Sequence, residues 1–323
     1  MSSTMTRNLD DMILDVSADC PHQPGEDPSW QESSLFVWHD LDQGIGGFWR
    51  LGQEPVVSQL NSCFGMFTHD GLRFRSNVTG VPMAKSDRGE TFMGWGNALR
   101  VDLDVLKIKA DFPDCEAQLQ FTDFFPRYDY IKMVSGDAMP EGTAHHIEVA
   151  GRMTGKVRIG ERELEINALG YRDRSWGPRD WGFLRGTRWW PCVFGPDLSI
   201  HTLVALTYNG KLMKVGYVFR DGVPIPIKDV EVLVSLESDA LSPTSGMARI
   251  TLPDGEQLDL SCEVTDGIIL HVRGYTAVEG IGTAQLGVRR GMSNLEVSTN
   301  AGGGTSAPVL ALGANMGDGL SRR

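Results

Sequence analysis

The 323-residue sequence predicts an all-β fold made of two consecutive antiparallel β-barrels or β-sandwiches. Tight-turn dipeptides recur between runs of strand-forming residues, and apolar and polar residues alternate in Val230–Ser238. We find no stretch with the 3.6-residue period of an amphipathic helix beyond about twelve residues. The length fits two halves of about 130 residues each.

Five dipeptides that supply positive φ mark the expected hairpins. They are Asp70-Gly71, Asn209-Gly210, Asp221-Gly222, Asp254-Gly255 and Asp266-Gly267. Runs typical of strands flank the first, second and fourth of them, namely Cys63–Thr68 and Leu72–Val78, Leu203–Tyr208 and Leu212–Phe219, and Met247–Leu252 and Gln257–Val264. This spacing indicates antiparallel strands joined in sequence order.

The two ends of the chain differ from its middle in composition. Residues 1–29 are polar and contain three prolines, which predicts a loosely packed arm with a short helix near Asp10–Val16. Residues 301–323 are rich in glycine, which predicts a flexible tail.

The seam between the two halves is expected where the strand pattern is interrupted. Gly136–Gly142 breaks the pattern, so we expect the seam within residues 140–185. We place a first β domain at residues 30–150 and a second at residues 151–300.

Charge and cysteine content exclude several classes of function. A formal net charge of −12 at pH 7 disfavours binding to nucleic acid and to anionic membranes. The first residues lack the apolar core of a signal peptide, and we find no window of about 18 apolar residues for a membrane span. Five widely spaced cysteines form no CxxC pair, which favours reduced thiols in a cytoplasmic protein without a metal site.

The segment Gly170–Trp190, which reads GYRDRSWGPRDWGFLRGTRWW, is the most unusual part of the sequence. It holds four of the eight tryptophans, five arginines, two aspartates and no lysine. Tryptophan offers a large apolar face on which arginine can stack while it binds a carboxylate. This composition predicts a buried polar cluster within an aromatic wall, which suits an active site or a structural plug.

Strand alternation divides this segment into two faces. If Tyr171–Ser175 is extended, Asp173 shares a face with Tyr171 and Ser175, and the opposite face carries Arg172, Arg174 and Trp176. Tryptophan faces would raise the pKa of the Asp173 carboxyl by desolvation, whereas arginines would lower it. Asp173 is therefore the candidate general acid. Asp180, next to Arg179, is expected to be ion-paired.

Histidines and the remaining tryptophans are weaker candidates. His39 could serve as a base but is interpreted as an ordinary polar residue, as is His69 at a turn. The pair His145-His146 makes a poor joint metal site, because adjacent strand residues point to opposite faces. His201 alternates with apolar residues and is expected to enter the second barrel. The sequence contains no HExxH, Walker, GxSxG or helix-preceding GxGxxG motif. Glycine-flanked Trp49 and Trp95 fit either core packing or a cavity wall.

The motif GYRDRSWGPRDW resembles the AttH-like and carotenoid 1,2-hydratase-like superfamily, over about residues 30–300. The matching positions are Asp173, Trp176 and Gly177. The resemblance implies two consecutive lipocalin-like barrels. It also implies the chemistry of hydratases that add water to an acyclic carotenoid, or of fungal Diels–Alderase-type cyclases. Those hydratases are expected to carry histidine where this chain has Arg174, and arginine cannot shuttle a proton as a base.

The leading hypothesis is a cofactor-independent enzyme that protonates a C=C bond of an apolar terpenoid or polyketide. Hydration, isomerisation or cyclisation would follow. Candidate catalytic residues are Asp173, Trp176 and Asp180, and candidate substrate-binding residues are Tyr171, Arg174, Arg179, Trp181, Trp189, Trp190, His201, Trp49 and Trp95.

Two alternatives remain open at the level of sequence. In the first, the protein binds a hydrophobic ligand without catalysis, and the Arg/Asp/Trp cluster is a structural latch. In the second, the arginines bind a carboxylate or phosphate on an otherwise apolar ligand.

Overall fold

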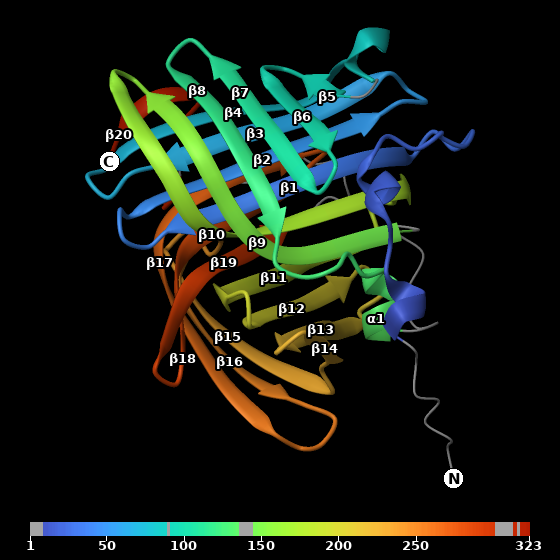
Figure 1. The fold of residues 1–323 in the computed structure, drawn as a ribbon, viewed down its shortest axis with the longest axis vertical. Helices are drawn as coiled ribbons and strands as arrows, with labels where there is room; N and C mark the ends of the chain where they lie inside the picture. The colour runs from blue at the N-terminus through green and yellow to red at the C-terminus, as the bar shows by residue number, and fades with distance from the viewer. Residues whose placement is uncertain (1–8, 89–90, 136–144, 301–312, 315–316) are drawn as a thin grey trace.

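A computed structural model describes residues 9–88, 91–135, 145–300, 313–314 and 317–323. Two antiparallel sheets of eleven and nine strands account for most of these residues (Figure 1), which confirms the all-β class. Short helices are η1 (Leu9–Met12), η2 (Val16–Asp19), η3 (Lys85–Asp87) and α1 (Tyr130–Ser135). None of the helices in the described ranges is long and apolar enough to cross a membrane.

The first sheet has the strand order β20-β4-β3-β2-β1-β10-β9-β8-β7-β6-β5 and curls over itself. In Figure 1, β6, β7 and β8 cross in front of β2, β3 and β4. The apolar faces enclose a core that contains Trp38, Trp49 and Phe121. The strands are β1 (Trp30–Asp40), β2 (Ile45–Glu54), β3 (Gln59–Phe67), β4 (Leu72–Pro82), β5 (Thr91–Gly94), β6 (Asn97–Asp102), β7 (Val105–Phe112), β8 (Cys115–Asp123), β9 (His145–Ile159), β10 (Arg162–Pro178) and β20 (Gly319–Arg322).

The second sheet has the strand order β14-β13-β12-β11-β19-β18-β17-β16-β15. Its own core contains Trp190, Val230 and Ile250. The strands are β11 (Leu184–Gly195), β12 (Leu198–Thr207), β13 (Leu212–Arg220), β14 (Val223–Pro226), β15 (Asp229–Leu236), β16 (Pro243–Thr251), β17 (Gln257–Val272), β18 (Tyr275–Leu286) and β19 (Arg289–Thr299).

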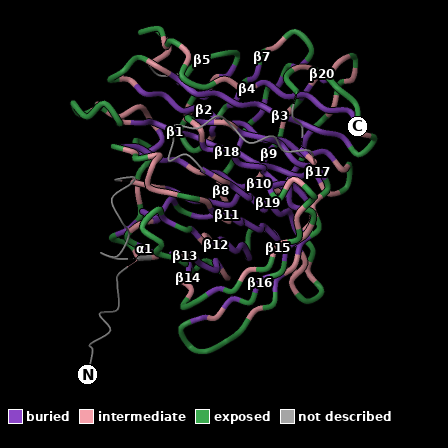
Figure 2. The backbone as a smooth tube through the Cα atoms, turned by 180° about the vertical axis from the view of Figure 1, so that it is seen from behind, coloured by how far each residue is buried: buried purple, intermediate pink, exposed green. Residues whose placement is uncertain are grey.

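A third core lies where the two sheets face each other. Val37 and Phe48 from the first sheet belong to the same buried cluster as Val193 and Ile281 from the second. Figure 2 shows buried residues along the central strands of both sheets and exposed residues at the loops. The middle strands, such as β1 and β2, are therefore buried on both faces, which is why β2 has no exposed residue.

The chain passes from the first sheet to the second between Pro178 and Leu184. This point falls within the seam expected at residues 140–185. Residue 150, the division chosen from the sequence, lies inside β9, so the GYRDRSWGPRDW motif begins on a strand of the first sheet. The glycine-bounded interruption at residues 136–142 lies outside the described residues.

Four of the five expected hairpin turns are present. Gly71, Gly210, Gly222 and Gly255 each have φ between +81° and +94°, the region that favours glycine. The expected turn at Asp266-Gly267 is wrong, because β17 runs through both residues with only a register shift before Asp266. Asp266 is buried in an ion pair with Arg73 on β4.

The N-terminal arm is packed more tightly than its composition predicts. Two 3-10 turns, η1 and η2, replace the expected helix, and Met12, Ala18 and Asp19 are buried. At the other end, the last residues form β20 and pair with β4, so this part of the expected flexible tail is a strand.

Gly47 should tolerate no side chain, because it lies opposite Trp38 in the β1–β2 register. A Cβ at this position would lie 2.1 Å from the Trp38 ring. We expect Gly47→Ala to lower the free energy of unfolding by about 1–3 kcal/mol, as overpacking of a core does. Gly25→Ala is the control, since its Cβ would meet only the Trp30 ring at 3.5 Å. Equal urea midpoints for both variants would contradict this prediction.

Candidate functional site

The side chains of β10 alternate between two environments, as predicted. Tyr171 and Asp173 face the second sheet, where the Tyr171 hydroxyl lies 2.8 Å from that of Tyr217 on β13. Arg172 and Arg174 face the opposite side, where they contact the N-terminal arm. The motif therefore serves two separate purposes, one on each face.

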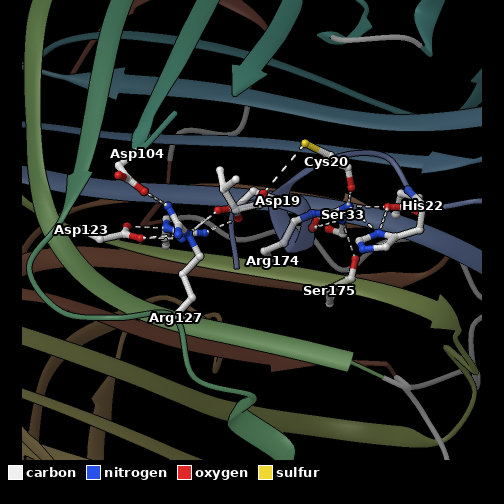
Figure 3. A network of polar contacts seen from close by, with 12 residues as sticks. Asp19, Cys20, His22, Ser33, Asp104, Asp123, Arg127, Arg174 and Ser175 are labelled. Atoms are coloured by element: carbon white, nitrogen blue, oxygen red, sulfur yellow. Dashed lines mark hydrogen bonds and ion pairs between the residues drawn. The ribbon is translucent and has the colours of Figure 1, made fainter. Parts of the chain in front are cut away.

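On the arm side, the arginines form a network of buried ion pairs (Figure 3). Arg172 binds the carboxylates of both Asp19 and Asp123 through four hydrogen bonds of 2.7–3.2 Å. Arg127 also pairs with Asp19 at 2.7 Å. These contacts attach the arm to the first sheet, so this half of the motif is structural.

Arg174 and Trp176 complete the same structural face. Arg174 forms an ion pair with Glu32 and donates to the carbonyl of Cys20 at 2.9 Å (Figure 3). The Trp176 ring is stacked between His22 and His145, with ring centroids 4.2 and 4.8 Å away. Both residues therefore lie on the opposite face of β10 from Asp173.

On the side that faces the second sheet, three ionisable groups meet. The Nε2 atom of His146 lies 2.8 Å from Oδ2 of Asp173 and 3.0 Å from Oε1 of Glu148. Strand geometry brings them together, since His146 and Glu148 are two residues apart on β9 and Asp173 is the register partner of Glu148 on β10. We call these three residues the carboxylate–histidine centre.

Aromatic residues surround this centre. The Trp189 indole donates to Oε1 of Glu148 at 2.9 Å, and the Tyr217 hydroxyl donates to the Glu148 carbonyl at 2.9 Å. The His201 ring is stacked with Tyr171 at 5.7 Å and is edge-on to Tyr130 of α1 at 5.1 Å. His201 thus faces the space between the sheets rather than the interior of the second barrel.

The three groups of the carboxylate–histidine centre have pKa values that are shifted in different directions. Burial alone would lower the pKa of His146, but the carboxylates of Asp173 and Glu148 outweigh it and raise that pKa to about 10. Burial would raise the pKa of Asp173, but His146, with help from Arg179 and Arg50, lowers it. Burial raises the pKa of Glu148 to about 7 against the opposing effect of His146. Glu148, not Asp173, is therefore the carboxyl that holds a proton near neutral pH.

Several polar atoms beside the centre have no hydrogen-bond partner among the described residues. They are Oε2 of Glu148, the hydroxyl of Tyr130 and both ring nitrogens of His201. Burial lowers the pKa of His201 to about 3, so this ring is neutral. Unpartnered buried groups are costly and gather where a protein binds something else. These atoms therefore mark the centre as a candidate site for a ligand.

A family model described as "Domain of unknown function (DUF7064)" matches residues 15–301. The chain belongs to this family. A comparison with curated proteins finds no match for this chain.

A comparison with solved structures finds two that share this fold. The crystal structure of CghA with Sch210972 has a TM-score of 0.62 and 12% identity, and the match covers 84% of this chain and 89% of CghA. An AttH-like protein from Nitrosomonas europaea has a TM-score of 0.62 and 9% identity, over 86% of this chain and 97% of that protein. At these identities the likeness concerns the fold, and it confirms the fold expected for the AttH-like superfamily.

The other residues predicted for the site are dispersed. Trp190 and Trp49 lie inside the second and first barrel cores, and Trp95 is 53% exposed in a turn. Asp180 accepts a hydrogen bond from the Gly182 backbone in an exposed turn and forms no ion pair within the described ranges. The Arg179 guanidinium lies 4.2 Å from the Trp181 ring, at the edge of the interface.

The sequence reasoning missed the roles of His146 and Glu148. The spacing His-x-Glu on a strand would place both side chains on one face, and this signal was available. Their ligand atoms and that of Asp173 lie within 4.8 Å of one another, which is close enough for a cation. Because His146 Nε2 shares hydrogen bonds with both carboxylates, we interpret the cluster as a proton-holding centre.

A groove of about 1180 Å³ lies on the outer face of β6–β10. Exposed charged residues such as Lys107, Lys156 and Glu165 line it. It does not reach the centre, whose His146 and Asp173 side chains are each 16% exposed. We therefore place the candidate site between the sheets rather than in this groove.

The raised pKa of His146 should make stability fall as pH rises. The folded protein keeps the His146 proton up to about pH 10, whereas the unfolded chain releases it near its ordinary pKa of about 6.5. This contribution is therefore complete below pH 6.5 and is lost as pH approaches 10. Between pH 7 and 8, we expect the wild-type free energy of unfolding to fall more steeply than that of His146→Gln, by roughly 1.4 kcal/mol per pH unit. Urea titrations at each pH test this, and parallel slopes would contradict it.

Proposed function

We propose that the protein is an enzyme that protonates a carbon–carbon double bond of an apolar, unsaturated small molecule of terpenoid or polyketide type. Hydration, isomerisation or cyclisation would follow, and side chains of the protein alone would supply the proton. The observation that carries the proposal is the buried Glu148 carboxyl. It has a pKa of about 7, an unpartnered oxygen and a charged histidine beside it.

Glu148 is suited to act as the acid of this reaction. A general acid works best when its pKa is near the working pH, and burial brings Glu148 to that range. The hydrogen bonds from Trp189 and His146 both reach Oε1, which leaves Oε2 to carry the proton toward a substrate. Asp173 keeps His146 charged and oriented, which is a positioning role.

The proposed step transfers the Glu148 proton to one carbon of the double bond. The π electron pair forms the new C–H bond and leaves a carbocation at the other carbon. The cation then loses a neighbouring proton, is attacked by a second double bond before it loses a proton, or adds water. In each case the Glu148 carboxylate accepts the proton that is released, so the acid is regenerated.

The aromatic residues around Glu148 would stabilise the cation. The faces of Tyr171, Trp189 and Tyr217 carry negative quadrupole density, and such contacts contribute about 2 kcal/mol or more when they are desolvated. All three rings are buried, since none is more than 7% exposed. The same rings form an apolar surface that suits a hydrocarbon chain.

Incubation in D2O tests this function directly. Geranylgeraniol, squalene and lycopene serve as probes, together with any compound extracted from the freshly purified protein. We expect at least one probe to give a product that has one deuterium on carbon, since the Glu148 proton exchanges with solvent before each turnover. Conversion without deuterium on carbon would contradict C=C protonation, and retention of an unchanged ligand would favour a binding protein.

A further inference from the structure

Arg50 on β2 lies in line with the carboxylate–histidine centre. In the register of the first sheet, Arg50 pairs with Leu35 on β1, Leu35 pairs with Asp173 on β10, and Asp173 pairs with Glu148 on β9. Register partners in antiparallel strands point to the same face, so all four side chains face the second sheet. Arg50 and the proposed acid, Glu148, thus lie at opposite ends of this row of side chains.

The Arg50 guanidinium is buried, and its terminal nitrogens have no polar partner among the described residues. The residue is 3% exposed. No carboxylate of the described residues forms an ion pair with it. Burial and the charge of Arg179 lower its pKa to about 10, so it remains charged at neutral pH. A buried, unpaired cation is costly, and an anion beside it would remove that cost.

Gln31 on β1 is a second unpartnered group at the same place. It is 2% exposed, and neither its amide oxygen nor its amide nitrogen has a partner among the described residues. The two side chains converge above Gly52, where a Cβ would lie 3.0 Å from the Gln31 amide nitrogen and 3.1 Å from both Arg50 nitrogens. The Trp181 ring lies 5.8 Å from the Arg50 guanidinium carbon.

Two acidic residues near Arg50, Glu279 and Asp173, do not pair with its charge. Glu279 on β18 is fully buried across the interface, and burial raises its pKa well above the ordinary value, which favours its neutral form. Asp173 is already hydrogen-bonded to His146. Arg179, stacked on Trp181, adds a second positive charge. The arginines therefore favour a negatively charged ligand at this end of the row.

We propose that Arg50 and Gln31 form a subsite for the carboxylate of an amphipathic substrate. The planar guanidinium can donate two parallel hydrogen bonds to a carboxylate, and the Gln31 amide nitrogen can donate a third. This inference rests on the proposed function for its catalytic meaning, because it names the substrate class of the same site.

The row also sets the distance between the carboxylate and the reacting carbon. Neighbouring strands are about 4.8 Å apart, so Arg50 lies about 10 Å from Asp173 and about 14 Å from Glu148 along the row. Leu35 provides an apolar surface between them. The substrate is therefore an unsaturated acid whose double bond lies roughly 10–14 Å from its carboxylate.

Thermal unfolding with octanoate and 1-octanol tests the subsite at pH 7 and constant ionic strength. A ligand that binds only the folded protein raises the Tm as its concentration rises, and this gives its Kd. We expect octanoate to bind the wild-type protein at least tenfold more tightly than octanol, and Arg50→Met to lose this preference. Arg50→Lys keeps the charge without the planar fork and should lose part of it.

The variants also separate this proposal from the catalytic one. Arg50→Met removes an unpaired charge from the interface, so its Tm without ligand should equal or exceed that of the wild-type protein. Glu148→Gln should keep the octanoate shift. If octanoate binds through Arg50 while no probe is converted, the subsite stands and the enzymatic function fails. Equal Kd values for octanoate and octanol, or an octanoate shift that survives in Arg50→Met, would overturn the subsite.

Discussion

Arg172→Met is expected to lower the free energy of unfolding by about 3–5 kcal/mol, the range found when one partner of a buried ion pair is removed. Arg172 is 1% exposed and binds both Asp19 and Asp123. Its loss leaves two negative charges beside each other with Arg127 as their remaining cation in the described network. The N-terminal arm would then lose its ion pair with β10 and keep only weaker contacts such as that of Arg174 with the Cys20 carbonyl.

Urea denaturation of Arg172→Met and a surface control measures this effect. Arg162→Met removes an exposed ion pair with Asp70, in which both side chains are more than one third exposed. Such pairs contribute about 0–1 kcal/mol. A loss below about 1 kcal/mol in Arg172→Met would show that the network does not hold the arm.

The faces of β10 could be predicted from the sequence because strand alternation is a local property. The period of two separated Asp173 from Arg172 and Arg174, and the structure places them accordingly. The same rule explains why Trp189 and Trp190, adjacent in sequence, enter different cores. Their composition suggested one aromatic wall, but alternation divides the tryptophans between the interface and the second barrel.

The centre itself could not be predicted in full because it depends on strand pairing. His146 and Glu148 meet Asp173 only in the β9–β10 register, which joins residues 25 and 27 positions apart. Asp266-Gly267 has the composition of a turn, yet β17 continues because Asp266 pairs with Arg73, 193 residues away. Long-range contacts of this kind override local turn preference and leave no local pattern.

The packing of the N-terminal arm also depends on long-range contacts and could not be predicted from its composition. Proline and polar residues predicted loose packing, but Asp19 is 2% exposed because Arg172 and Arg127 bind it. A polar segment can be buried when it supplies charges that a buried strand requires. The sequence singled out the arginines of the motif, but Asp19, one partner of Arg172, lies in a segment that the composition gave no reason to consider.

Glu148→Gln is expected to reduce turnover of a substrate found in the D2O assay by about 10²–10⁴-fold, the usual contribution of a positioned general acid. Glutamine keeps the size of the side chain and an oxygen for the Trp189 indole, but it has no acidic proton to give. The effect should fall on kcat more than on KM, because the proton is transferred only in the transition state.

Two further variants distinguish the acid from its surroundings. Glu54→Gln changes another buried glutamate of the first sheet, which pairs with Arg273 rather than with His146, and it should retain activity within a few fold. Asp173→Asn should lower the pKa of His146, because the Asp173 carboxylate raises it. The pH dependence of kcat should shift as a result, since Asp173 acts on Glu148 through His146. Full activity in Glu148→Gln, with a loss of activity only in Asp173→Asn, would assign the acid to Asp173 instead. The comparison is direct because the two variants differ only in which carboxyl is removed.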